Sequence, residues 1–180
     1  MRIALTGTPG TGKTSVARLL PYRVLDINAL IKDEMLHLGN DPNRGCLIAD
    51  VDALEKRIDE LVCAEPDEDV VLESHFSHQF APVAIVLRTS PKVLKDRLAK
   101  RGYSEKKIRE NLEAETLDVI LVEAVEWCDQ VHEIDTTQRS AEETADLVTK
   151  IIRGEAKLPP GKIDWTVDID WIGEMDFDLG

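Results

Sequence analysis

The sequence predicts an α/β fold in which helices cover both faces of a central parallel sheet. Short, fully apolar segments, typical of strands buried in a parallel sheet, alternate along the chain with segments of helical periodicity. A glycine-rich segment, residues 7–14 (GTPGTGKT), connects the first apolar segment to the first helical one. With 180 residues, the chain is long enough for one such domain with a substantial core.

The N-terminal half is expected to supply three strands and three helices. Pro21 ends the first helix, Asn28 can cap the second, and Gly39 can end it. Residues 40–45, which are rich in Asn, Pro and Gly, predict a turn, and an amphipathic pattern begins near residue 50. The expected strands are residues 3–5, 22–27 and 70–72, and the expected helices are residues 15–20, 28–38 and 50–63.

The C-terminal half continues the alternation. Pro91 opens a helix that Gly102 breaks, and Ser104 can cap a long helix that ends near Trp127. Four residues at helical spacing predict the buried face of this long helix: Leu117, Leu121, Ala124 and Cys128. The remaining expected elements are strands at residues 83–87 and 131–134 and a helix at residues 140–153, begun by the capping-box pair Ser140 and Glu143.

Residues 7–14 fit the phosphate-loop pattern of glycine, four residues, and Gly-Lys-Ser/Thr. The backbone N–H groups of such a loop, with the start of the following helix, point at one small volume where a phosphate binds. Gly10 and Gly12 permit backbone angles that a Cβ would block. Lys13 can reach the terminal phosphates of a nucleoside triphosphate, and Thr14 can offer its hydroxyl to Mg²⁺. A chance match is the alternative, which the strand before and the helix after disfavour.

The charge balance restricts the partners of the chain. Lys and Arg number 22 against 35 Asp and Glu, and the net charge of −13 opposes general binding to nucleic acid. Residues 92–109 are the exception, with eight basic and two acidic side chains, as expected of a segment that faces a nucleotide. The three cysteines lack a CxxC pair, which favours reduced thiols in the cytoplasm over a zinc site. Neither a membrane span nor a signal peptide is expected from the apolar pattern.

Polar residues follow two of the apolar strands. Glu73 comes directly after the third predicted strand, where phosphate-loop enzymes place the acid that holds the Mg²⁺ shell; the alternative is a surface glutamate. His75 could orient a phosphate acceptor, or could be a structural or solvated histidine. Arg88 follows the fourth strand and Arg101 lies at a helix break, so either can supply the cation that phosphoryl transfer needs.

The last 22 residues, 159–180, differ in composition from the rest of the chain. They begin with Pro-Pro-Gly, contain the triplet Ile-Asp-Trp twice, and carry six acidic side chains and one basic side chain. Such a tail is either a strap packed on its own domain or a docking segment for a basic partner.

Four segments of the chain occur in the order known from one protein family. They are Gly7–Thr14, the step Glu73-Ser74-His75, Leu87-Arg88-Thr89, and Arg101-Gly102-Tyr103-Ser104-Glu105-Lys106-Lys107. Together they resemble the adenylate kinase isoenzyme 6 family, also called the coilin-interacting nuclear ATPase family, which includes an archaeal branch. The resemblance covers residues 1–153. This chain departs from the family at Glu73, where Asp is usual, and at Lys32, which stands where a family arginine can be placed.

The resemblance implies a phosphate-loop fold of the nucleoside-monophosphate kinase type. The kinase domain would span residues 1–158, with an acceptor-binding segment at 28–51 and a short lid at 100–110. The implied reaction is ATP + AMP to 2 ADP with Mg²⁺, accompanied by ATPase activity. The family also implies a role in small ribosomal subunit maturation and rRNA processing, through a basic small-subunit ribosomal protein.

The expected site residues fall into four groups. Catalysis is assigned to Lys13, Glu73, His75 and Arg101; ATP binding to Gly10, Gly12, Lys13, Thr14, Ser15 and Arg101; acceptor binding to Asn28, Lys32 and Arg88; and Mg²⁺ binding to Thr14 and Glu73, partly through water. Two other functions stay open. One is a ribosome-assembly ATPase that acts mainly on a ribosomal protein, and the other is a small-metabolite kinase, because lysine at position 32 cannot make the bidentate fork of arginine to a phosphate.

Overall fold

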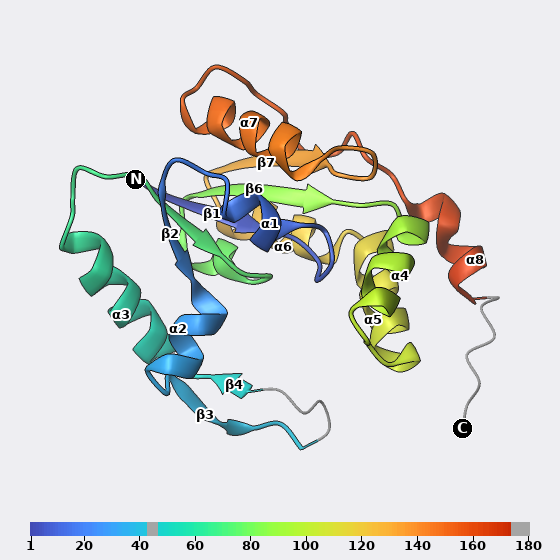
Figure 1. The fold of residues 1–180 in the computed structure, drawn as a ribbon, viewed down its shortest axis with the longest axis horizontal. Coiled ribbons are helices and arrows are strands. Elements are labelled where there is room, and N and C mark those ends of the chain that lie inside the picture. Colours follow the sequence, from blue (N-terminus) through green and yellow to red (C-terminus); the bar gives the residue numbers. More distant parts are fainter. Residues whose placement is uncertain (43–46, 174–180) are drawn as a thin grey trace.

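The computed structural model describes residues 1–42 and 47–173, and its centre is a five-stranded parallel sheet. The strand order is β2-β5-β1-β6-β7, so the first strand lies in the middle of the sheet (Figure 1). The strands are β1 (Arg2–Thr6), β2 (Arg23–Asp26), β5 (Val70–Glu73), β6 (Val83–Arg88) and β7 (Gln130–Asp135). Each boundary lies within one residue of its predicted position, because the apolar runs are short and clearly bounded.

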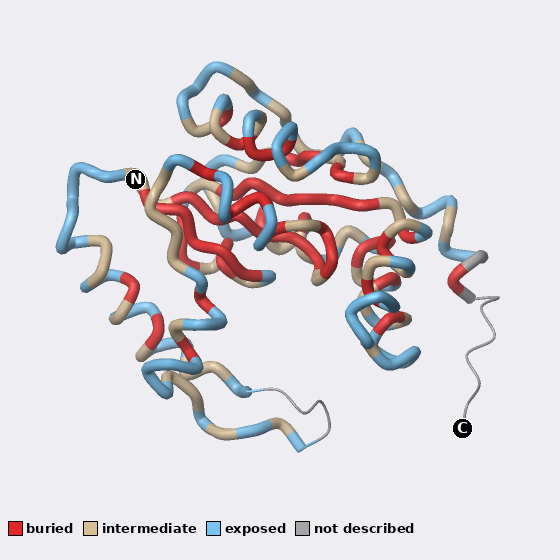
Figure 2. Tube along the Cα trace, in the orientation of Figure 1, coloured by how far each residue is buried: buried red, intermediate tan, exposed pale blue. Residues whose placement is uncertain are grey.

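Helices cover both faces of the sheet, as predicted. On one face lie α1 (Lys13–Ala17) and α7 (Ala141–Ile152); on the other lie α2 (Ile27–Asp33), α3 (Val51–Cys63), α6 (Val119–Trp127) and the 3-10 helix η1 (Ser77–Phe80). Alternate residues of β1 face the two layers: Ile3 and Leu5 pack in the cluster with α1 and α7, and Ala4 packs in the other cluster. Figure 2 shows the sheet as the most deeply buried part of the chain.

A helical pair lies beside the carboxyl edge of the central strands. It consists of α4 (Pro91–Lys100) and α5 (Glu105–Thr116), joined by the turn of residues 101–104 (Figure 1). Gly102 has a φ of 74°, which ends α4 as predicted, and the Ser104 side chain caps α5 by accepting a hydrogen bond from the Lys107 N–H. The predicted capping box at Ser140 and Glu143 is also confirmed at the start of α7.

The long helix predicted over residues 104–127 is in fact two helices. α5 ends at Thr116, Asp118 takes a left-handed conformation with a φ of 57°, and α6 begins at Val119. Leu121 and Ala124 are buried as predicted, but Leu117 at the break is 54% exposed. The break changes the direction of the chain, so the helical spacing of the apolar residues does not continue through it.

The segment predicted as a helix at residues 28–38 is also corrected. Its cap is Asp26, whose side chain accepts from the Ala29 N–H at 3.0 Å, and the helix α2 ends at Asp33. A two-stranded antiparallel hairpin follows, formed by β3 (His37–Asn40) and β4 (Leu47–Ala49). Residues 43–45 of the predicted turn at 40–45, together with Cys46, lie outside the described residues.

The described part of the tail lies against the domain. The Leu158 carbonyl accepts from the Glu133 N–H at 2.9 Å, and the N–H groups of Gly161 and Lys162 donate to the Glu133 carboxylate. The tail then forms η2 (Thr166–Asp168) and α8 (Ile169–Gly173), and Ile172 is buried against α4 and α5. This arrangement corresponds to the strap alternative for residues 159–173, while residues 174–180 lie outside the described chain. None of the helices in the described ranges has the length and apolar character to cross a membrane.

Candidate functional site

The phosphate loop connects the carboxyl end of β1 to α1 in the middle of the sheet. Gly7, Gly10 and Gly12 all have positive φ angles, of 134°, 98° and 106°. A Cβ at Gly7 would lie 2.3 Å from the Leu87 carbonyl oxygen, and one at Gly10 would lie 2.7 Å from the Leu94 side chain. The backbone angles therefore favour glycine at all three positions, and the close packing against β6 and α4 requires it at Gly7 and Gly10.

Lys13 is buried at the floor of the loop. Its ammonium donates to the carbonyl oxygens of Gly7 at 2.7 Å and Thr8 at 3.1 Å. Burial lowers the pKa of Lys13 to about 8, and the carboxylates of Glu73 and Glu115 oppose part of this effect. The site thus holds a desolvated cation that an anionic ligand would stabilise.

Thr14 and Glu73 bring hard oxygen atoms together beside Lys13. The Thr14 hydroxyl lies 3.4 Å from Oε1 and 3.3 Å from Oε2 of Glu73, which ends β5 and is 4% exposed. Burial raises the pKa of the Glu73 carboxyl, and the Lys13 ammonium opposes this shift. An all-oxygen donor set with few protein ligands fits Mg²⁺, which keeps several waters and binds substrate phosphates. Across the described residues, no cluster of three or more His, Cys, Asp or Glu side chains offers an alternative metal site.

A cavity of about 180 Å³ lies beside the loop, between α4 and the start of α7, and Thr14 and Glu73 are not among its lining residues. Its walls include the predicted residues Gly10, Gly12, Ser15 and Arg101. They also include residues that the sequence analysis did not assign to the site: Arg97, Thr136, Arg139 and Ser140. The guanidinium of Arg97 donates to the Thr136 carbonyl at 3.0 Å, so this arginine connects α4 to the segment after β7. The sequence feature that could have indicated Arg97 as a site residue is its position one helical turn before Arg101.

Two of the predicted acceptor residues, Asn28 and Lys32, lie apart from this cavity, on the helix that follows the edge strand β2. Asn28 and Lys32 are exposed on α2, one turn apart, and α2 follows β2, whose last residue pairs in register with Glu73. His75 is exposed two residues beyond Glu73. Desolvation by the surrounding chain and the charge of Lys13 lower the pKa of His75 to about 4, so its imidazole is neutral at pH 7.

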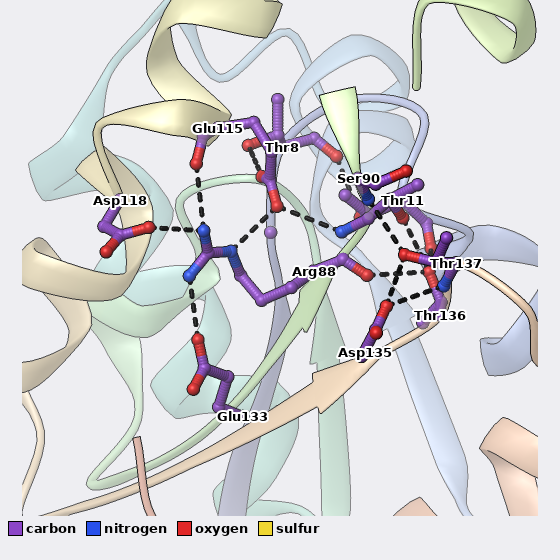
Figure 3. A network of polar contacts seen from close by, with 12 residues as sticks. Thr8, Thr11, Arg88, Ser90, Glu115, Asp118, Glu133, Asp135, Thr136 and Thr137 are labelled. Atoms are coloured by element: carbon purple, nitrogen blue, oxygen red, sulfur yellow. Dashed lines mark hydrogen bonds and ion pairs between the residues drawn. The ribbon is translucent and has the colours of Figure 1, made fainter. Parts of the chain in front are cut away.

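Arg88 does not lie where the predicted acceptor contact requires it. The side chain is 2% exposed and points into the protein, toward three carboxylates (Figure 3). It donates to Glu115 and Glu133 at 2.8 Å each and also pairs with Asp118. All three of its nitrogen atoms are engaged, so the guanidinium has no side to present to an acceptor phosphate. The assignment of Arg88 to the acceptor site is corrected accordingly.

Comparison with known proteins agrees with this arrangement. The AAA domain family matches residues 3–118. A protein of Methanosarcina barkeri named "Putative adenylate kinase" is 49% identical over 177 residues, covering 92% of this chain and 97% of its own. One of the same name from Archaeoglobus fulgidus is 47% identical over 176 residues, covering 94% of both chains.

The fold is also found among solved structures. Shikimate kinase from Acinetobacter baumannii, in complex with shikimate, superposes with a TM-score of 0.57 over 85% of this chain and 93% of its own, at 17% identity. At that identity the likeness concerns the phosphate-loop kinase fold alone. The similarity to the archaeal proteins extends over nearly the whole chain, and the chain belongs to the archaeal family named putative adenylate kinases, with an AAA domain over residues 3–118.

Proposed function

We propose that this protein is an adenylate kinase that converts ATP and AMP to two molecules of ADP. The observation that carries the proposal is that Lys13, Thr14 and Glu73 converge at one end of the sheet. On one side of them lies the cavity lined by Arg97 and Arg101, and on the other side lies the exposed face of α2. A donor nucleotide on the cavity side and an acceptor on the α2 side would place their phosphates over the loop. The names of the archaeal relatives support the choice of AMP as acceptor.

The transfer itself would need charge stabilisation and positioning more than a strong base. An oxygen of the AMP phosphate attacks the γ-phosphorus of ATP, and the bond from that phosphorus to the β-phosphate oxygen breaks, which leaves two ADP. Lys13 and Arg101 offset the negative charge on the transferring group, and the loop N–H groups hold the β-phosphate. Thr14 and Glu73 would hold Mg²⁺, partly through water, and this ion supplies further charge neutralisation when bound.

The acceptor side would use Asn28 and Lys32 of α2, with neutral His75 beside the transferred group. An imidazole that is neutral at pH 7 adds no positive charge but can accept or donate one hydrogen bond to the acceptor. The resemblance to the adenylate kinase isoenzyme 6 family supports an additional ATPase activity and a role with a basic small-subunit ribosomal protein. The net charge of −13 favours a basic partner for such a role.

The first test is ADP formation from Mg·ATP with and without AMP, CMP, GMP or UMP. We expect AMP to raise the rate well above that with ATP alone, because only a bound acceptor brings a nucleophile in line with the γ-phosphate. The rate with ATP alone, measured in the same buffer, is the control for hydrolysis. Slow hydrolysis that no monophosphate increases would contradict the kinase proposal. It would favour an assembly ATPase, to be tested by adding small-subunit ribosomal proteins.

We also expect ATP affinity to fall as the pH rises above about 8, the pKa of Lys13 in the nucleotide-free protein. The protonated ammonium binds phosphate and the neutral amine does not, while the terminal phosphate is already ionised in this range. The dissociation constant should therefore rise about tenfold per pH unit beyond that pKa. Calorimetric titration from pH 7 to 9.5 measures this slope. A flat profile in the native protein, or an unchanged slope in Lys13→Met, would contradict the assignment.

A further inference from the structure

The buried carboxylate of Glu115 connects the phosphate loop to the helix after the turn at residues 101–104. Glu115 lies on α5, and its side chain is 2% exposed. Its Oε2 accepts a hydrogen bond of 2.5 Å from the hydroxyl of Thr8, the second residue of the loop. Its Oε1 accepts from Arg88 at 2.8 Å and from the Thr89 N–H at 3.0 Å (Figure 3). The kinase site described above gives no role to this carboxylate.

Thr8 occupies a central position in the loop. Its carbonyl oxygen accepts three hydrogen bonds: from the Thr11 N–H at 3.2 Å, the Thr11 hydroxyl at 2.9 Å and the Lys13 ammonium at 3.1 Å. The first two close the turn of the loop, and the third positions the cation at its floor. A rotation of Thr8 would disturb all three, so the contact between its hydroxyl and Glu115 fixes more than one side chain.

The charge of Glu115 would by itself oppose phosphate binding, because an anion behind the loop weakens the positive field in front of it. Arg88 offsets this charge, and it also pairs with Glu133 on β7 and with Asp118. Glu115 and Glu133 are therefore equivalent as buried partners of Arg88, with side chains 2% and 1% exposed. They differ in what else they contact: Glu115 accepts from Thr8 of the loop, whereas Glu133 accepts from the tail backbone at Gly161 and Lys162.

We propose that Glu115 is a positioning residue for the phosphate loop, acting through the Thr8 hydroxyl. It keeps the loop carbonyls, and through them Lys13, in the arrangement that receives the donor phosphates. It also connects the loop to α5, so that the helix after the turn at residues 101–104 and the loop keep a fixed relation. The proposal deepens the proposed function and rests on ATP being the ligand of this loop.

The expected effects of Thr8→Val and Glu115→Gln follow from this geometry. Thr8→Val removes the hydroxyl but leaves every charge and nearly the same side-chain volume, and Glu115→Gln keeps the shape but removes the acceptor charge. Each should raise the dissociation constant for an unreactive ATP analogue about tenfold, since a hydrogen bond to a buried charge is lost. The two changes together should weaken binding about as much as either alone, because they remove the same contact. Thr8→Ser retains the hydroxyl and should bind the analogue like the native protein.

Glu133→Gln is the matched control. It removes an equally buried carboxylate from Arg88 without a direct change at the loop. Both glutamine variants should lower the unfolding midpoint, but only Glu115→Gln should weaken nucleotide binding. Equal binding losses in both variants, or native binding by Thr8→Val, would overturn the proposal and leave Glu115 with a structural role alone.

The binding readout separates this proposal from the kinase assignment. If the native protein binds the ATP analogue but no monophosphate stimulates ADP formation, the kinase assignment fails, and the comparison of Thr8→Val with Thr8→Ser still tests Glu115. If the protein transfers phosphate to AMP but Thr8→Val binds ATP normally, only the role of Glu115 is refuted. Circular dichroism confirms folding, and Thr8→Val provides the test if Glu115→Gln fails to fold.

Discussion

Replacement of Lys13 by methionine is expected to lower phosphoryl transfer by about 10³-fold, the effect of losing one preorganised donor to the developing charge. The ammonium already lies at the floor of the loop, held by the carbonyls of Gly7 and Thr8, so no rearrangement of the backbone is needed for it to face a phosphate. Methionine fills a similar volume without charge. Because the charge is lost in both the ground state and the transition state, ATP binding should weaken as well.

The folded state should tolerate this change. The buried ammonium is desolvated, which is why its pKa falls to about 8, so an apolar side chain at this position removes an unfavourable burial. The unfolding midpoint of Lys13→Met should therefore remain near that of the native protein. Lys150→Met, on the exposed side of α7, is the control for loss of a positive charge and should transfer phosphate at the native rate. Near-native turnover in Lys13→Met would refute the assignment of the loop.

The phosphate loop and the sheet could be predicted because their signals are local. Seven consecutive residues form the loop from Gly7 to Lys13, and its turn contains local hydrogen bonds from the Thr11 N–H and hydroxyl to the Thr8 carbonyl. Each buried strand is a short apolar run, since a parallel strand covered on both faces is apolar on both sides. Glu73 could be placed at the edge of the sheet for the same reason: it ends such a run.

The segment between α2 and α3 was predicted wrongly because its local pattern is weak. Leu36 and Leu38 extend the apolar spacing of α2, but Met35 adopts a positive φ of 54° and the chain turns into the hairpin of β3 and β4. The same applies at Asp118, where a left-handed residue separates α5 from α6. Non-glycine residues with positive φ are uncommon, and the sequence gives little warning of them. In the case of Asp118, the side chain pairs with Arg88, a contact that the sequence alone does not reveal.

Arg88 illustrates why part of the site could not be predicted. Its place at the carboxyl end of β6 agrees with expectation, but the direction of its side chain depends on partners 27, 30 and 45 residues away in the sequence. Arg97 and Arg139 were missed for the related reason that their place at the cavity depends on how α4 and the chain after β7 pack together. Arginine near a phosphate loop is ambiguous in sequence, because the same guanidinium serves a phosphate or a buried carboxylate equally well.

Replacement of Arg88 by methionine is therefore expected to act on stability first. It leaves Glu115 and Glu133 buried without their cation, and removal of one partner from a buried ion pair typically costs about 3–5 kcal/mol of unfolding free energy. Arg88→Lys should lose less, because it keeps the charge but cannot donate to three carboxylates in the same fork geometry. Urea unfolding followed by circular dichroism measures both variants against the native protein.

Arg57→Met is the matched control for this prediction. Arg57 also contacts two carboxylates, Glu34 at 2.7 Å and Glu60 at 3.1 Å, but its side chain is 34% exposed whereas that of Arg88 is 2% exposed. Water solvates the carboxylates that Arg57 would leave behind, so its loss should change the unfolding midpoint far less. If the two variants were equally stable, the network around Arg88 would not be a stabilising element. If Arg88→Met instead raised the KM for the acceptor while unfolding at the native midpoint, the original assignment of Arg88 to acceptor binding would be supported and the structural role refuted.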